Sequence, residues 1–167
     1  GGVGTFAVQL AKEYGAEVTG ICSTTKTELV RSIGADRVVD YTREDFADGR
    51  TRYDVILDIA GNRPLSHLRR ALAREGTLVI VGGEGGGRWL GGIDRQLRAH
   101  LLSPFVRQKL GTWIATQRTE DLETLGELLE AGKLTPVVDR TFPLSEAAEA
   151  IRYLRDGRAR GKVVITV

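Results

Sequence analysis

Hydrophobic positions along the chain switch between two spacings, and this predicts helices and strands in alternation. The apolar residues of 5–14 recur at helical spacing, and Gly15 follows where a left-handed cap would end that helix. The next segment, 17–22, is short and rich in β-branched residues, which is typical of a buried strand. Thr25 and Glu28 then have the spacing of a capping box, so a second helix is expected to begin there.

The same alternation continues to the end of the chain. Further strands are predicted at 37–40, 54–59, 77–81, 110–115, 135–139 and 162–167, with 54–59 expected to be fully buried. Helices are predicted at 65–76, 93–106, 120–131 and 146–155, the last capped by Ser145. Strands that are apolar on both faces and separated by helices predict an α/β fold, a doubly wound parallel sheet with helices on each side.

The chain begins with a glycine cluster, Gly1, Gly2, Val3 and Gly4, which matches the latter half of a dinucleotide-binding fingerprint. In that fingerprint the glycines let the backbone approach a pyrophosphate, and the amino end of the following helix stabilises its charge. Alone, the cluster also fits an ordinary tight turn, but a helix and then a strand follow at once. Because the strand before such a fingerprint is the central one of the sheet, we expect a Rossmann fold that lacks its first strand, in a chain cut from a longer protein.

The end of the second strand of such a fold distinguishes the two nicotinamide cofactors. An acidic residue is expected there when a free ribose hydroxyl is bound. This chain instead has Ser23, Thr24 and Lys26, which would attract a 2′-phosphate that a carboxylate would repel. The segment therefore predicts NADP(H) as the cofactor, although Ser23 and Thr24 also fit simple helix capping.

Composition and charge narrow the range of protein classes and binding partners that fit this sequence. Hydrophobic residues make up 41% and charged residues 28%, and no apolar run approaches the roughly 20 residues of a membrane-spanning helix, so we expect a soluble protein. The net charge of +2 is spread over many segments, which argues against nucleic acid as a partner. Cys22, His67 and His100 are too few for a structural zinc site, so no metal is predicted, and a reducing cytoplasm is the expected location.

Several longer stretches carry a family resemblance. They are GGVGTFAVQLAK (1–12), GADRVVDY (34–41), YDVILDIAG (53–61), GTLVIVGG (76–83) and GKVVITV (161–167). With them the chain resembles the carboxyl-terminal part of a medium-chain dehydrogenase/reductase, of the quinone oxidoreductase-like, zinc-binding dehydrogenase type. This resemblance extends over nearly the whole chain.

The resemblance implies further cofactor-binding residues. Lys26 and Tyr41 would hold the adenosine 2′-phosphate, while Lys162 would reach the pyrophosphate. The remaining implied positions lie at strand ends beside the cofactor and its nicotinamide: Ala60, Gly61, Val81, Gly82 and Gly83. Without the family, Tyr41 would be an aromatic at the edge of the core and Lys162 an exposed strand-edge lysine.

The resemblance also implies a domain organisation and an activity. Residues 1–117 would form the NADP(H)-binding domain, and 118–167 would return to a catalytic domain, so no catalytic residue is assigned within this chain. The expected activity is NADPH-dependent hydride transfer to a quinone, enone or similar activated alkene. An enoyl-reductase module of a larger synthase and a non-catalytic dinucleotide-binding regulatory module are the alternatives. The expected partner is a small-molecule substrate, with no nucleic acid or membrane, and a homodimer is one possibility for the complete protein.

Overall fold

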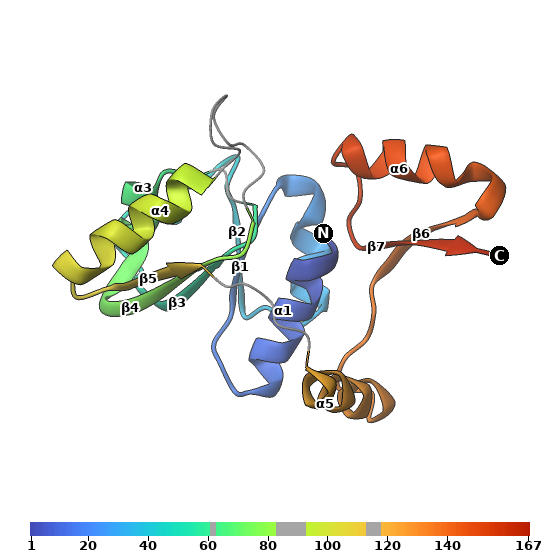
Figure 1. The fold of residues 1–167 in the computed structure, drawn as a ribbon, viewed down its shortest axis with the longest axis horizontal. Helices are drawn as coiled ribbons and strands as arrows, with labels where there is room; N and C mark the ends of the chain where they lie inside the picture. Colours follow the sequence, from blue (N-terminus) through green and yellow to red (C-terminus); the bar gives the residue numbers. More distant parts are fainter. Residues whose placement is uncertain (61–62, 83–92, 113–117) are drawn as a thin grey trace. The chain divides into compact units, whose positions relative to one another are not determined.

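The computed structural model describes residues 1–60, 63–82, 93–112 and 118–167, which form an α/β fold (Figure 1). Every pair of neighbouring strands within these residues is parallel, as the doubly wound fold requires. In chain order the elements are α1 (Gly2–Glu13), β1 (Thr19–Cys22), η1 (Thr24–Lys26), α2 (Thr27–Ser32), β2 (Arg37–Asp40), β3 (Tyr53–Asp58), α3 (Leu65–Ala71), β4 (Leu72–Ile80), α4 (Ile93–Leu102), η2 (Ser103–Phe105), β5 (Lys109–Thr112), α5 (Thr119–Glu130), β6 (Val138–Pro143), η3 (Leu144–Glu146), α6 (Ala147–Arg155) and β7 (Lys162–Thr166).

These elements form two compact units. One contains residues 1–44 and 117–167, and the other contains residues 45–116. Strands β1 and β2 pair in the first unit, as do β6 and β7, whereas the second unit holds a sheet in the order β3-β4-β5. The assignment of 1–117 and 118–167 to separate domains of a complete protein stays a prediction.

The first helix confirms the predicted glycine cap but begins earlier than the apolar spacing indicates. Gly15 has a φ of 77°, and its N–H donates to the carbonyl of Lys12, while the Ala16 N–H donates to the carbonyl of Ala11. These two bonds close the helix in a Schellman motif. Helix α1 starts at Gly2, and its first turn offers only Val3 between two glycines, which is too little apolar pattern to mark the start.

Both predicted side-chain caps are wrong. Thr25 lies inside the 3-10 turn η1, and α2 begins only at Thr27, with no capping bond from a side chain. Ser145 likewise lies inside η3, and α6 begins at Ala147 behind Glu146. In each case a 3-10 turn precedes the helix, so the residue with capping chemistry lies too early to reach the amides of the helix.

The core of the second unit lies between its sheet and the helices α3 and α4, which pack against β4 and β5 (Figure 1). Its buried apolar side chains are Leu68, Ala71, Leu72, Leu78, Ile80, Ala99 and Leu110. The predicted helix 65–76 ends at Ala71, because Leu72 joins β4 and pairs with Tyr53. Apolar spacing alone does not reveal that change, since Leu72 continues the helical pattern while occupying a buried strand position.

Strand β3 is not fully buried, which corrects the sequence prediction. The side chains of Val55 and Leu57 are 60% and 47% exposed, although Asp58 at the strand end is buried. No other described residue covers the face that carries them. Within the described part of the chain, β1-β2 and β3-β4-β5 are separate sheets.

The strands β6 and β7 form a parallel pair with α6 packed against them. Strand β6 begins three residues later than predicted, at Val138. Phe142 and Ala150 are buried in this part of the fold. Gly161 precedes β7 at a close crossing, because an added Cβ would lie 2.9 Å from the Val137 side chain and nearer still to its carbonyl oxygen.

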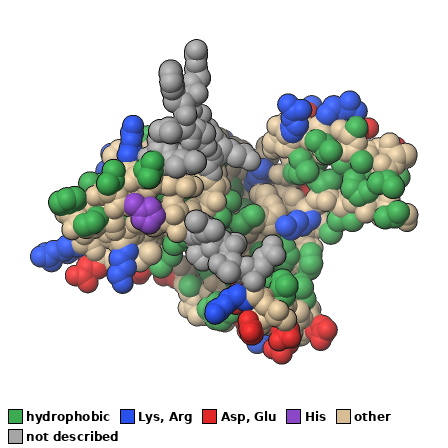
Figure 2. Space-filling model, viewed as in Figure 1, with side chains coloured by type: hydrophobic (Ala, Val, Ile, Leu, Met, Phe, Trp, Pro, Cys, Tyr) green, Lys and Arg blue, Asp and Glu red, His purple; other side chains and the backbone are tan. Residues whose placement is uncertain are grey.

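The surface mixes charges of both signs with apolar side chains on the face shown in Figure 2. None of the helices in the described ranges is long and apolar enough to cross a membrane.

Candidate functional site

The amino end of α1 is open to an anion. Gly1 is the N-cap and has no side chain that could cap the helix, and the first turn contains no acidic residue. The first backbone bond of the helix runs from the Thr5 N–H to the Gly1 carbonyl at 3.3 Å, so the preceding amides have no partner within the helix. Those amides and the helix dipole favour a negatively charged group at this position.

Lys162 lies across this first turn, although it comes from the start of β7. A Cβ added to Gly2 would lie 2.9 Å from Cδ and 3.1 Å from Nζ of Lys162, so the absence of a side chain at Gly2 makes room for the lysine. The Lys162 ammonium also lies 5.6 Å from the centre of the Phe6 ring. Lys162 is therefore an exposed strand residue whose side chain contacts the helix start, which is the placement that pyrophosphate binding needs.

The predicted phosphate-binding residues gather at the carboxyl ends of β1 and β2. Ser23 follows β1 and precedes η1, which ends at Lys26. The Tyr41 N–H donates to the Cys22 carbonyl at 3.0 Å, so Tyr41 lies beside that strand end with its side chain 43% exposed.

Asp40 organises this strand end, and sequence reasoning did not single it out. The Thr24 hydroxyl donates to Asp40 Oδ2 at 2.5 Å, and the N–H and hydroxyl of Thr42 donate to Oδ1 at 3.0 and 2.7 Å. These bonds hold the pKa of the Asp40 carboxyl below its usual value, and the bond from Thr24 contributes most to this. Because the Thr24 proton is directed at Asp40, Ser23 and Lys26 are the donors left for a phosphate.

The predicted strand-end residues of the second unit also lie together. The N–H groups of Val81 and Gly82 both donate to the Asp58 carbonyl, at 3.0 and 3.3 Å, which joins the ends of β3 and β4. Ala60 is exposed just beyond β3. A Cβ at Gly82 would lie 2.9 Å from the carbonyl carbon of Ile59, so only glycine allows this approach of two backbones.

Two of the predicted site residues, Gly61 and Gly83, lie outside the described residues. Of the predicted residues of the first unit beyond the glycine cluster, Lys162 contacts the start of α1, whereas the others lie at the ends of β1 and β2: Ser23, Thr24, Lys26 and Tyr41. Those of the second unit that the structure describes lie at the ends of β3 and β4.

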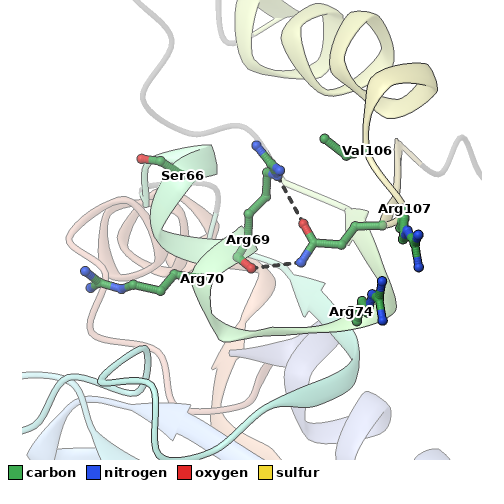
Figure 3. Close-up of a pocket in the computed structure, with 7 residues that line it drawn as sticks. Ser66, Arg69, Arg70, Arg74, Val106 and Arg107 are labelled. Carbon is green, nitrogen blue, oxygen red and sulfur yellow. Dashed lines mark hydrogen bonds between the residues drawn. The ribbon is translucent and has the colours of Figure 1, made fainter.

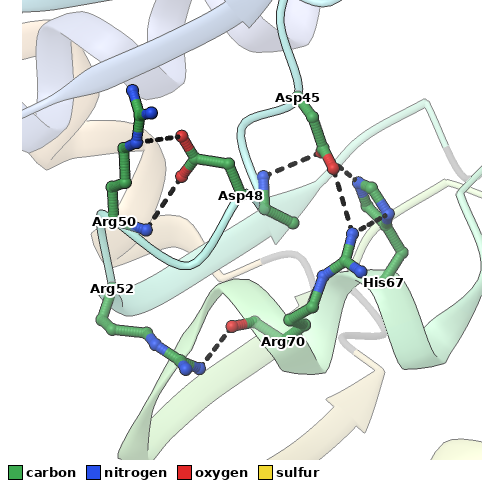
Figure 4. A network of polar contacts seen from close by, with 7 residues as sticks. Asp45, Asp48, Arg50, Arg52, His67 and Arg70 are labelled. Atoms are coloured by element: carbon green, nitrogen blue, oxygen red, sulfur yellow. Dashed lines mark hydrogen bonds and ion pairs between the residues drawn. The ribbon is translucent and has the colours of Figure 1, made fainter.

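Neither histidine is arranged as a metal ligand. His67 Nε2 lies 3.0 Å from Asp45 Oδ1, and the Arg70 guanidinium lies 3.0 Å from the other oxygen of that carboxylate (Figure 4). His100 lies 3.2 Å from the hydroxyl of Thr112. Among the described residues no group of three or more His, Cys, Asp or Glu side chains is placed to hold a metal ion.

Cys22 is 8% exposed, as expected for a small buried residue, and its burial raises the pKa of its thiol. A buried thiol that stays protonated is a poor nucleophile.

Comparison with known proteins identifies the family. A family profile described as zinc-binding dehydrogenase matches residues 33–165, most of the chain. The chain belongs to the zinc-binding dehydrogenase family. The resemblance noted from the sequence is thereby confirmed, as is the Rossmann-like fold.

Individual relatives are oxidoreductases. The chain is 38% identical over 184 residues to a mitochondrial NAD(P)H oxidoreductase of Mus musculus, covering 100% of this chain and 46% of that protein. It is 36% identical over 169 residues to the chloroplastic NADPH-dependent alkenal/one oxidoreductase of Arabidopsis thaliana, covering 99% of this chain and 38% of that protein. The chain thus spans less than half the length of these two relatives.

A solved structure matches the fold as well. The quinone oxidoreductase from Coxiella burnetii superposes with a TM-score of 0.84 at 28% identity, covering 99% of this chain and 50% of that one.

Proposed function

We propose that this chain binds NADP(H) as part of an oxidoreductase that reduces a quinone, enone or similarly activated alkene. The observation that carries the proposal is the placement of Ser23 and Lys26 directly after β1, where an acidic residue would select NAD(H). None of the ion pairs between described residues involves Lys26, so its charge is not already neutralised by a carboxylate.

The residues present fit the cofactor at two positions. The amides at the start of α1 and the Lys162 ammonium would hold the pyrophosphate, in the space that the missing side chain of Gly2 leaves. Lys26, Ser23 and Tyr41 would hold the adenosine 2′-phosphate. The sequence position after β1 that would select NAD(H) with an acidic residue is occupied by Ser23 and Thr24, and the nearby Asp40 carboxylate accepts the Thr24 hydroxyl bond.

The bound cofactor would supply a hydride, and the contribution of this chain would be binding and orientation. The backbone at Ala60, Val81 and Gly82 lies at the carboxyl ends of β3 and β4, the edge where ligands bind in sheets of this kind. The names of similar proteins support the substrate class, since the Arabidopsis thaliana relative is named an alkenal/one oxidoreductase and the Coxiella burnetii structure a quinone oxidoreductase. A small organic molecule is therefore the proposed substrate.

The name of the family mentions zinc, but the described residues offer no group of ligands for it. No step of the proposed reaction is assigned to zinc. The two relatives above are named mitochondrial and chloroplastic, so the cytoplasmic location stays a prediction.

The test compares NADPH and NADH affinity of the complete protein with and without the change Lys26→Ala. Loss of one charge-assisted bond to the 2′-phosphate is expected to weaken NADPH binding by roughly tenfold to a hundredfold, with little change for NADH. Lys133→Ala is the matched control, because it removes the same charge from the same unit at the end of α5, where Lys133 pairs with Glu13. An NADH preference that Lys26→Ala leaves unchanged would contradict the proposal.

A further inference from the structure

A depression of about 540 Å³ lies in the second unit and is lined mainly by arginine (Figure 3). Its arginines are Arg69 and Arg70 from the end of α3, Arg74 from the start of β4 and Arg107 from just before β5. None of its described lining residues is acidic. The volume is in the range of about 300–1,000 Å³ that is usual for small-molecule sites.

Gln108 fixes one of these arginines in place. Its Oε1 accepts a bond from Arg69 Nε at 3.0 Å, and its Nε2 donates to the carbonyls of Arg69 at 3.0 Å and Ala73 at 3.2 Å. These bonds join the end of α3 and the start of β4 to the segment before β5. A guanidinium held by its Nε keeps its two terminal nitrogens for another partner, and it loses little conformational freedom on binding one.

Three of the four charges have no carboxylate partner among the described residues. Arg70 points to the opposite side of the depression from Arg74 and Arg107, and it pairs with Asp45 (Figures 3 and 4). Among the described residues, Arg69, Arg74 and Arg107 form no ion pair. Positive charges gathered in one hollow without a carboxylate repel one another, so a bound anion would stabilise the arrangement.

The position of the depression separates it from the proposed cofactor site. It lies at the amino ends of β4 and β5, whereas Ala60, Val81 and Gly82 lie at the carboxyl ends of β3 and β4. Cofactors in open parallel sheets bind at the carboxyl edge, so this depression is not used by the dinucleotide. Its lining residues include no aromatic ring on which a nucleic-acid base could stack.

From these features we propose that the depression is a second binding site, which takes a small molecule carrying two or more phosphate or carboxylate groups. Guanidinium groups bind either kind of group through paired N–H donors. Arg69, Arg74 and Arg107 are the binding residues, and Gln108 is a positioning residue. The site is independent of the proposed reaction and would serve to regulate or stabilise the protein.

The test is calorimetric titration of the complete protein with inorganic pyrophosphate and, separately, with citrate, both with NADPH present in excess. The double variant Arg74→Gln/Arg107→Gln removes two binding residues that hold no described partner, so the fold should tolerate it. Each lost charge-assisted bond is worth about tenfold or more in affinity, so roughly a hundredfold weaker binding is expected. The control Arg50→Gln/Arg155→Gln removes the same charge from exposed positions elsewhere.

Weaker binding in the first double variant with unchanged binding in the control supports the site. Binding of pyrophosphate alone assigns it to phosphorylated ligands, and binding of citrate alone assigns it to polycarboxylates. Absence of binding by both probes overturns the proposal. An equal loss in both double variants also overturns it, because the effect would then come from net charge. Since all proteins are titrated under the same conditions, the comparison holds whether or not NADPH proves to be the cofactor.

Discussion

Replacement of Gly82 by alanine tests how closely the ends of β3 and β4 are packed. The N–H of Gly82 donates to the Asp58 carbonyl, which holds its backbone against the turn after β3. An added Cβ would lie 2.9 Å from the carbonyl carbon of Ile59 and nearer to its oxygen. Both of these atoms belong to the backbone, so neither can rotate away as a side chain would.

The size of the effect follows from that geometry. Non-bonded carbon and oxygen atoms in contact are normally more than about 3 Å apart, and the carbonyl oxygen is the nearer atom, so the backbone would have to separate by more than about 1 Å. Overpacking of this kind costs about 1–3 kcal/mol. Alanine also restricts the unfolded chain, which offsets roughly 0.4–1 kcal/mol of that cost. We therefore expect Gly82→Ala to lower the free energy of unfolding by about 1–2 kcal/mol.

Gly111→Ala supplies the control, because no atom lies within 4 Å of a Cβ added there in the neighbouring strand β5. This change should be neutral or stabilise by up to about 1 kcal/mol. The measurement is the urea midpoint of each variant of the complete protein. The midpoints are compared where the dependence of the free energy of unfolding on urea concentration is the same for both variants. Equal midpoints for the two variants would refute the reasoning.

Two further predictions concern the polar contacts of each unit. Gln108→Ala should lower the free energy of unfolding by about 1–2 kcal/mol, because it removes three hydrogen bonds and leaves two backbone acceptors without their donor; an unchanged urea midpoint would contradict this. The hydrogen bond from Lys12 is the main cause that lowers the pKa of the Asp36 carboxyl below its usual value. The Asp36 carboxylate therefore stabilises the fold above about pH 4, and this contribution is lost as the pH falls through the lowered pKa of the folded state. In the variant Asp36→Asn, the free energy of unfolding should therefore fall less steeply below about pH 4, as measured by unfolding curves at several pH values. The same fall with pH as in the wild-type protein would contradict this role of Asp36.

Most of the fold could be predicted from the sequence, because the local signals agree with the tertiary structure. Strand β2 occurs at the predicted residues, 37–40, and the helices α1 and α5 differ from prediction by a few residues at their starts. The predicted helix 65–76 ends too late for a reason that lies in the strand pairing. Leu72 fits both a helical and a strand pattern, and only its pairing with Tyr53 decides between them. Local patterns do not contain that information.

The exposure of β3 has a related explanation. The apolar run predicted a strand buried on both faces, but Val55 and Leu57 are exposed because no described residue covers them. An apolar run in the sequence indicates that a strand is suited to a buried position, whereas its actual burial depends on which segments pack against it. The sequence therefore predicted the environment for which β3 is adapted rather than the one that the described residues provide.

The two proposed anion sites differ in how far sequence reasoning can find them. Binding at the start of α1 depends on backbone amides, and glycines at fixed spacing are the sequence requirement for that backbone, so the fingerprint is visible in four consecutive residues. The arginine-lined depression depends on side chains from 69–74 and 107, which only the pairing of β4 with β5 brings together. Asp40 and Thr24 meet in the same way, through the pairing of β1 with β2. A site built from side chains across a sheet therefore needs the strand register before it can be recognised, and a site built from the backbone of one turn does not.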